Sequence, residues 1–333
     1  MESSNDTETM LFTSCTNETY LEFPKTMQFN DTHRMAIILF SVFMFCSAVG
    51  NIYVLISILR RKFNGNFSRI DLLLFHLTVA DLLVTFLMMP IHIGWNYTVS
   101  WQAGNFMCKL VLFLDIFGHY LTGFVVVVFS LDIYYAVVNP LGIAYADGRV
   151  KKMLVAAWIA SFICSLPQLL AWNLVKSPKF ECFEQCWFGL GSKMFNFIYI
   201  VFCITFLTVF PLLMIIFCYS CILYQVCHAD NKKSTETQLR RSSTEALGRA
   251  RVRTMKMSIT IVTTFFLCWT PLTIVWLLFV IDSNIIANLG QLIQKISLLL
   301  ICTNATLNPI IYGFFSIRRK QKANQSSAVG TSK

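Results

Sequence analysis

The chain has 333 residues, of which 56% are hydrophobic and only 13% are charged, and its formal net charge is +10. With a mean hydropathy of +0.62, it has too little polar surface for a water-soluble enzyme of this length, and that class is excluded. The apolar residues are grouped into long stretches, which predicts a membrane protein.

Seven apolar stretches run along the chain, five without charge and two with aspartate inside them. Each is long enough to cross roughly 30 Å of hydrocarbon at about 1.5 Å per helical residue. No alternating ten-residue pattern of a membrane barrel is present, so we predict an all-α seven-transmembrane helix bundle. The predicted spans are Met35–Leu59, Leu72–Gly94, Cys108–Val138, Met153–Val175, Met194–Cys227, Met257–Ile281 and Ile296–Ile317.

The basic residues indicate which side each loop occupies. Four regions, 60–69, 139–152, 228–256 and the tail from Arg318, together hold 20 of the 27 Lys and Arg. Cytoplasmic loops retain basic residues, so these regions are predicted inside and the N-terminus outside. The positive charge is attributed to membrane sidedness rather than to nucleic-acid binding, because it lies at the ends of spans and not across one folded face.

Three segments follow from this topology. Residues 1–34 form an extracellular tail without the apolar core of a cleavable signal peptide, so the first span is expected to act as its own signal. The seven-helix domain covers 35–313 and contains the long cytoplasmic loop 228–256, whose Ser, Thr, Arg and Lys content predicts mobility. In 314–333, Phe314 and its neighbours beside basic residues predict a short amphipathic helix on the inner leaflet.

Glycosylation and disulfides are expected on the outer side. The sequons at Asn5, Asn17 and Asn30 are predicted to carry glycans. Of the 12 cysteines, eight fall in predicted helices and four face the oxidising side, which predicts two disulfides with three possible pairings. No metal site is predicted, because the four lack paired zinc-ligand spacing. The four outer cysteines are Cys15, Cys108, Cys182 and Cys186.

Polar residues inside the spans are costly and need an explanation. Asp81 lies in the middle of the second span, and four neutral side chains lie at comparable depth. One carboxylate among neutral oxygens can hold a Na⁺ ion or a proton, or can join helices by hydrogen bonds, and these uses remain open. The neutral members are Asn51, Thr122, Asn304 and Asn308.

Proline inside a span breaks a backbone hydrogen bond and predicts a kink. Kinks around a polar core suggest a conformational switch. The prolines concerned are Pro90, Pro167, Pro211, Pro271 and Pro309.

Catalytic patterns are absent from the sequence. It contains neither His-Glu-x-x-His nor Gly-x-Ser-x-Gly, and Gly189-Leu-Gly-Ser-Lys is too short to cradle phosphate. Three carboxylates at three depths resemble neither one active site nor the repeated path of a transporter. We therefore predict no enzyme activity and no cofactor, other than the Na⁺ considered near Asp81.

A set of motifs distributed over nearly the whole chain resembles the marker set of rhodopsin-like G-protein-coupled receptors. They are Gly50-Asn51, Leu77-Thr-Val-Ala-Asp81, Cys108, Asp132-Ile133-Tyr134, Trp158, Pro211 with Tyr219, Phe265-x-x-Cys268-Trp269-x-Pro271 and Asn308-Pro309-x-x-Tyr312. Within that class, the run from Met89 to Gly104, followed by Cys108-Lys109, resembles the gonadotropin-releasing hormone, adipokinetic hormone and corazonin receptors. Vasopressin/oxytocin-type receptors share part of this pattern and are the rival resemblance.

The resemblance implies a plasma-membrane receptor for an extracellular peptide, with a heterotrimeric G protein, membrane lipids and arrestin as inner partners. Trp269 would lie under the ligand with Phe265 and Pro211 beside it. The implied activation switch comprises Asp132, Ile133, Tyr134, Pro211, Tyr219, Phe265, Trp269, Pro271, Asn308, Pro309 and Tyr312. The same resemblance suggests the disulfide pairs Cys108 with Cys182 and Cys15 with Cys186.

Carrying over ligand contacts from the family points to His92, Trp95, Asn96, Asp115, Gln168, Trp269 and Phe279. Two of them depart from the gonadotropin-releasing hormone receptors, which have an acid where this chain has His92 and a lysine where it has Asp115. An acid there favours a cationic or hydrogen-bond-donating ligand group. Alternatively, His92 and Asp115 pair with each other. Asn96 either contacts ligand or carries a glycan on its own sequon.

Ile133 replaces the arginine of the family's Asp-Arg-Tyr triplet, so Asp132 loses its adjacent partner. One hypothesis is weak coupling or a binding-only receptor. The other is compensation by basic residues of the long loop, namely Arg249, Arg251 and Arg253. The tail is short and has few Ser or Thr for arrestin.

Overall fold

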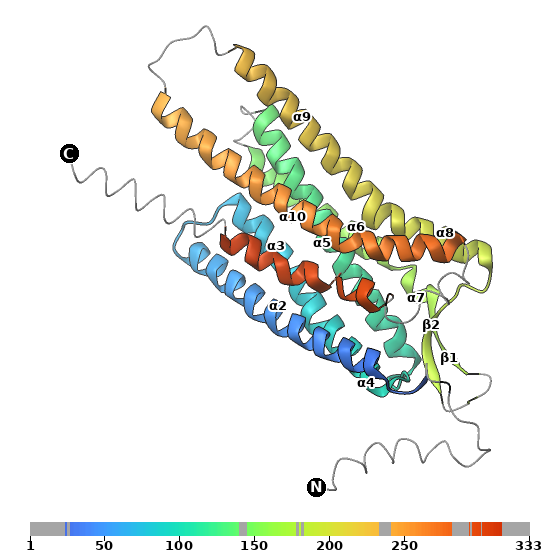
Figure 1. The fold of residues 1–333 in the computed structure, drawn as a ribbon. Helices are drawn as coiled ribbons and strands as arrows, with labels where there is room; N and C mark the ends of the chain where they lie inside the picture. The colour runs from blue at the N-terminus through green and yellow to red at the C-terminus, as the bar shows by residue number, and fades with distance from the viewer. Residues whose placement is uncertain are drawn as a thin grey trace.

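In a computed structural model of the protein, the described residues are 24, 27–139, 145–177, 180, 183–232, 241–281, 293, 295–300 and 302–314. Within them, seven helical spans are long and apolar enough to cross a membrane, as predicted. They form a bundle with a small β-hairpin at the end where the first span begins (Figure 1). The helices are α2 (Asp31–Phe63), α3 (Arg69–Leu83), α4 (Met89–Thr98), α5 (Gly104–Val138), α6 (Ala146–Ser165), α7 (Gln168–Ala171), α8 (Lys193–Ile204), α9 (Phe210–Lys232) and α10 (Arg241–Ile281), followed by the seventh span Lys295–Phe314.

Two predicted proline kinks take the form of π-helical turns. The second span is widened at Val84–Met88, directly before Pro90, and the fifth at Thr205–Val209, directly before Pro211. Proline lacks an N–H and its ring collides with the carbonyl four residues earlier, so one wider turn accommodates it without ending the span. Pro167 instead separates α6 from α7.

The fourth predicted span was too long at its outer end. The helix stops at Ala171, and β1 (Trp172–Lys176) pairs antiparallel with β2 (Glu184–Phe188). Apolar length alone placed residues up to Val175 in the helix, but Val175 is 47% exposed on β1. The β-branched and aromatic residues here suit a half-exposed strand, which hydropathy cannot distinguish from a helix end.

The cytoplasmic loop predicted over 228–256 is largely helical where it is described. Helix α9 continues to Lys232 and α10 begins at Arg241. Hydropathy marks where the membrane ends, whereas good helix formers such as Glu, Ala, Leu and Arg extend the helices beyond it. The predicted amphipathic helix lies beyond Phe314, outside the described residues.

Helix α5 forms the centre of the bundle. About two thirds of its membrane window is buried (67%), against 22% for α2, so α5 packs on protein while α2 leaves most of its surface to lipid. Close approach elsewhere relies on glycine: a Cβ on Gly50 would lie 2.9 Å from Pro309 Cβ, so only glycine allows this contact of α2 with the seventh span.

Candidate functional site

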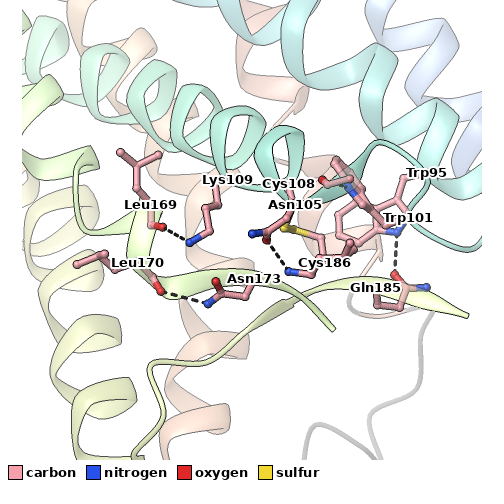
Figure 2. The surroundings of a disulfide bond; sticks show 12 residues. Trp95, Trp101, Asn105, Cys108, Lys109, Leu169, Leu170, Asn173, Gln185 and Cys186 are labelled. Carbon is pink, nitrogen blue, oxygen red and sulfur yellow. Dashed lines mark hydrogen bonds between the residues drawn. A yellow bond between two sulfur atoms is a disulfide. The ribbon is translucent and has the colours of Figure 1, made fainter. Parts of the chain in front are cut away.

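The hairpin is attached to the outer end of α5 by a disulfide between Cys108 and Cys186, whose Cα atoms are 5.7 Å apart (Figure 2). The predicted pairings of Cys108 with Cys182 and of Cys15 with Cys186 were therefore both wrong, because Cys108 and Cys186 are bonded to each other. In the hairpin register Cys186 faces Leu174, whose N–H donates to Asn105 Oδ1 at 3.0 Å, so β2 brings Cys186 over the start of α5. Cys15 and Cys182 lie outside the described residues.

The outer end of α4 is attached to the same hairpin. Trp95 Nε1 donates to Gln185 Oε1 at 2.9 Å (Figure 2), and Gln185 Nε2 donates to the Val99 carbonyl at 2.5 Å. Since its N–H is used within the protein, Trp95 offers a ligand only ring surface. Val99 has φ +60° and is the centre of a turn in which Ser100 N–H donates to the Thr98 carbonyl at 2.6 Å. A β-branched residue is strained there.

His92 is part of an aromatic stack and not an ion pair with Asp115. Its ring lies 5.2 Å from that of Phe40 and 6.2 Å from that of Trp95, nearly parallel to both. Among the described residues, the ion-pair partner of Asp115 is His119. His92 is thus a buried residue that packs between α2 and α4. Asp115 and His119 lie within electrostatic range of its ring.

Asn96 faces the seventh span. Its Nδ2 donates to the His92 carbonyl at 2.7 Å, and its Oδ1 accepts from Lys295 Nζ at 2.7 Å. Lys295 was missed because it lies one residue before the predicted seventh span. Lys295 could have been found from the sequence because it is one of the few basic residues predicted on the outer side.

Asp115 is connected to Trp269 through His119, a second residue that the sequence did not single out. His119 Nδ1 is 3.0 Å from Asp115 Oδ1, one helical turn away, and the His119 ring meets the Trp269 ring edge-on with centroids 4.8 Å apart. The i, i+4 spacing of an acid and a histidine inside an apolar span was the available signal. The structure thereby brings Asp115 and Trp269 together from α5 and α10.

The remaining predicted contacts lie farther around the bundle. Gln168 is buried, and its Oε1 accepts a hydrogen bond from the Tyr199 hydroxyl, which joins α7 to α8. Lys109 Nζ donates to the Leu169 carbonyl at 3.1 Å beside it (Figure 2). Phe279 lies on α10, but its side chain is outside the described part of the chain.

Two of the residues in the predicted switch, Phe265 and Trp269, pack against each other. The Phe265 and Trp269 rings are 5.7 Å apart. A Cβ on Gly123 would meet Phe265 Cζ at 3.4 Å and Pro211 Cγ at 3.8 Å, so α5 lies directly against both residues. Pro271 lies inside α10, two residues beyond Trp269, and Tyr219 is half-buried on α9.

The polar core is smaller than predicted. Asn308 Nδ2 donates to Asp81 Oδ2 at 2.9 Å, and Asn51 Nδ2 donates to the Ala305 carbonyl at 3.0 Å. These residues and Thr78 line a cavity of about 10 Å³, room for one water-sized particle. Thr122 does not line it, since its hydroxyl donates to the Gly118 carbonyl on its own helix.

The residues around this cavity fit either a water or a Na⁺ ion. The donor set of one carboxylate with amide and hydroxyl oxygens suits a hard cation. Asn308 Oδ1 and Asn304 Oδ1 have no hydrogen-bond partner among the described residues; of the two, Asn308 lines the cavity. Asp81 and Asn308 would hold such an ion, which would supply charge compensation between the second and seventh spans.

On the cytoplasmic side, Asp132 has a partner that the sequence did not indicate. Arg69 Nη1 lies 3.3 Å from Asp132 Oδ1, and Arg69 Nε lies 3.5 Å from Asp147 Oδ1. Ile133 is buried at 6% exposure, and the adjacent Tyr134 packs on Phe217 of α9. The side chains of Arg249, Arg251 and Arg253 lie outside the described residues, so their compensating role is untested.

Tyr312 is in contact with a neighbouring ion pair. The Arg61 guanidinium lies 5.6 Å from the Tyr312 ring centroid, and Arg61 Nη2 is 2.8 Å from Asp71 Oδ1. The inner end of the seventh span is thereby held near the loop that follows α2.

Of the predicted glycosylation sites, Asn5 and Asn17 lie outside the described residues. Asn30 is the N-cap of α2, and its Oδ1 accepts from the His33 backbone N–H at 3.2 Å.

Seven helical spans, a disulfide-anchored outer hairpin and a proline-rich polar interior define a seven-transmembrane receptor. Comparison with known families agrees: the sequence model of the 7 transmembrane receptor (rhodopsin family) matches residues 50–312, and the chain belongs to this family. It is therefore a multi-pass receptor of the plasma membrane and not an enzyme.

Its relatives narrow the class. The chain is 33% identical over 303 residues to the gonadotropin-releasing hormone II receptor of Clarias gariepinus, covering 88% of this chain and 78% of the relative. It is 32% identical over 267 residues to the gonadotropin-releasing hormone receptor of Rattus norvegicus, with 78% and 80% covered. For the gonadotropin-releasing hormone II receptor of Callithrix jacchus, identity is 34% over 286 residues, with 81% and 72% covered.

Proposed function

We propose that this receptor binds an extracellular peptide of the gonadotropin-releasing hormone, adipokinetic hormone and corazonin type and transmits that binding to a heterotrimeric G protein. The observation that carries the proposal is the position of Asp115, which retains 16% side-chain exposure and contacts Trp269 through His119. Eleven residues from the start of α5, it lies about 16 Å below the outer end of the helix. A ligand group at Asp115 would act directly on the packing around Trp269.

The peptide would enter from the hairpin side. Asn96 and Lys295 offer a polar contact between α4 and the seventh span, and Asp115 offers an acidic contact on α5. His92 and Trp95 form aromatic wall between them, while Gln168, Trp269 and Phe279 complete the proposed set. A glycan on Asn96 would be attached at Nδ2, and the donation of Nδ2 to the His92 carbonyl disfavours that use.

Binding would act by biasing an existing equilibrium between inactive and active bundles. The proposed movable elements are the α10 helix around Trp269 and Pro271, the packing of Phe265 against Pro211, and the inner ends carrying Tyr219 and Tyr312. Asn308 and Pro309 would carry the change into the polar core.

At the inner end, Asp132, Ile133 and Tyr134 would face the G protein, with the basic loops adding attraction to anionic lipid. Arrestin is a further proposed partner. Glycans are proposed at Asn5, Asn17 and Asn30, and a Na⁺ ion beside Asp81.

The second candidate function is that of a binding-only or atypically coupled receptor, because Ile133 stands where the family's Asp-Arg-Tyr triplet has an arginine. Arg69 supplies the ion pair to Asp132, but it does so from α3 and not from α5.

The test is a panel of synthetic gonadotropin-releasing hormone, adipokinetic hormone, corazonin, vasopressin and oxytocin peptides on cells that express the full chain. Calcium, cyclic AMP and labelled-peptide binding are measured separately, with vector-only cells as reference. We expect one of the first three peptide types to bind and to raise a second messenger. Binding without a messenger would support the second candidate function, and selective response to vasopressin or oxytocin would support the rival peptide class.

The site itself is tested with Asp115→Lys and the matched control Asp31→Lys, which reverses an acid of 95% side-chain exposure at the start of α2. Potency should fall only for Asp115→Lys. Equal potency of both variants at equal surface expression would remove Asp115 from the site.

A further inference from the structure

Helix α5 carries an acid–imidazole pair below the outer end of the bundle. His119 Nδ1 lies 3.0 Å from Asp115 Oδ1, and the side chains are 7% and 16% exposed. Both point from one turn of α5 toward a layer that also contains Trp269 of α10, whose ring meets the His119 ring at 83°. This pair is thus in direct contact with the residue proposed to move on activation.

Three polar atoms in this layer are unsatisfied. Among the described residues, Asp115 Oδ1, His119 Nε2 and Trp269 Nε1 are buried without a hydrogen-bond partner, and Trp269 is only 3% exposed. Buried polar atoms without partners are costly and uncommon, so each needs an explanation. The two unsatisfied atoms on α5, a carboxylate oxygen and an imidazole nitrogen, indicate a place where a donor from outside the chain is accepted.

The pairing with Asp115 determines what His119 offers. A nitrogen 3.0 Å from a carboxylate carries the proton, because a lone pair there would be repelled by the oxygen. In neutral His119 the proton is therefore on Nδ1, and Nε2 presents a lone pair. When Asp115 is ionised and His119 is neutral, the pair has a net charge of −1 in an apolar layer.

The nearby titratable groups leave this charge uncompensated. His92 is within electrostatic range, but its ring is held in the stack with Phe40 and Trp95. The thiol of Cys302 and the hydroxyl of Tyr199 are also within electrostatic range of Asp115, and neither group can carry a positive charge. Lys295 is engaged by Asn96 near the outer end of the seventh span.

We propose that Asp115 and His119 form one subsite for a nitrogen donor of the peptide, such as an ammonium, guanidinium or amide N–H, and that His119 is the specificity-determining residue. The inference rests on the proposed function, because it places one group of that peptide. The donor binds His119 Nε2 while the Asp115 carboxylate compensates its charge. Because the imidazole touches Trp269, occupancy of the subsite changes the packing of the switch.

The test combines His119→Phe with peptide analogues. His119→Phe keeps the ring and its packing but removes both nitrogens, and His119→Asn shortens the side chain while keeping hydrogen-bonding capacity. The probe is the most potent peptide of the panel, with each donor-bearing group replaced in turn by a non-donor of similar size. Loss of one hydrogen bond to a charged group corresponds to about 10- to 100-fold in potency.

On the native receptor, we expect one analogue to be about 10- to 100-fold less potent than the parent peptide. On His119→Phe, the analogue and the parent peptide should be equally potent. On His119→Asn, part of the difference between them should return. His76→Phe is the matched control: it removes a histidine of α3 whose Nδ1 accepts from Trp158 of α6. If the loss of potency caused by each analogue adds to the loss caused by His119→Phe at equal surface expression, the proposed subsite is wrong.

A peptide-free arm separates this inference from the proposed function. The purified full chain is heated with methylguanidinium, with tetramethylammonium as a cation that lacks N–H donors. Methylguanidinium should raise the Tm of the native chain but not of His119→Phe or Asp115→Asn. If methylguanidinium raises the Tm in this pattern while no peptide of the panel binds, the subsite is supported and the proposed peptide class is wrong. If the Tm shifts are equal for all three chains, the subsite is wrong.

Discussion

Arg69 at the start of α3 and Asp132 near the inner end of α5 form an ion pair with Nη1 and Oδ1 3.3 Å apart. The Asp132 side chain is 8% exposed and that of Arg69 25%, so the contact lies at the edge of the buried interior. Arg69 also contacts Asp147 at 3.5 Å. One arginine therefore links α3, α5 and α6 at the face where Ile133 replaces the family's arginine.

Replacing Arg69 by alanine should destabilise the receptor by about 1–3 kcal/mol, because it leaves a buried carboxylate unpaired. Adding Asp132→Asn to the same chain should recover most of the loss by removing that charge. Thermal unfolding of the purified chain measures both. Arg34→Ala is the control, since its partner Asp31 is 95% exposed; a loss as large in Arg34→Ala as in Arg69→Ala would contradict the prediction.

Restoring arginine at Ile133 should raise the maximal second-messenger response to the active peptide. The new guanidinium would lie next to Asp132, compete with Arg69 for it, and become available to the G protein when that contact opens. Peptide affinity should change little, because Ile133 is at the opposite end of α5 from Asp115. An unchanged maximum at equal surface expression would show that coupling does not need this arginine.

The disulfide pairing is directly measurable. Non-reducing peptide mapping by mass spectrometry should recover Cys108 joined to Cys186, which closes a loop of 78 residues. Loss of this bond removes about 4–5 kcal/mol in the chain-entropy account, so Cys186→Ser should reduce surface expression sharply. Recovery of a Cys108–Cys182 peptide from the native receptor would refute the pairing; Cys182→Ser should leave the Cys108–Cys186 peptide intact.

Val99→Gly should stabilise the receptor. Val99 has φ +60°, where a β-branched side chain costs about 1–3 kcal/mol and glycine costs little. Because glycine also increases the freedom of the unfolded chain, we expect a net rise in Tm of a few degrees. Val175→Gly, at an exposed position of β1 in regular strand conformation, should lower the Tm instead; a fall for both variants would mean that the turn is not strained.

Much of the fold could be predicted from sequence because the membrane acts locally on each segment. Whether Met35–Leu59 crosses hydrocarbon depends on its own apolar length, and the basic residues beside it give its direction. The proposed switch residues Phe265 and Trp269 could also be named, because they stand in a motif that resembles the family's. Hydropathy did not predict two features of secondary structure: α9 and α10 extend into the segment 228–256, and Val175 lies on a strand.

The sequence by itself determined the seven spans and their sidedness, since these are properties of single segments in contact with lipid and water, and its motifs indicated the class of receptor by resemblance. Tertiary structure decided the partners: Cys186 for Cys108, Arg69 for Asp132, Lys295 for Asn96, and His119 between Asp115 and Trp269. Each contact depends on how far apart two helices or strands lie and on which face each of them turns toward the other. A bundle can bring many such pairs together, and only the packed geometry selects among them.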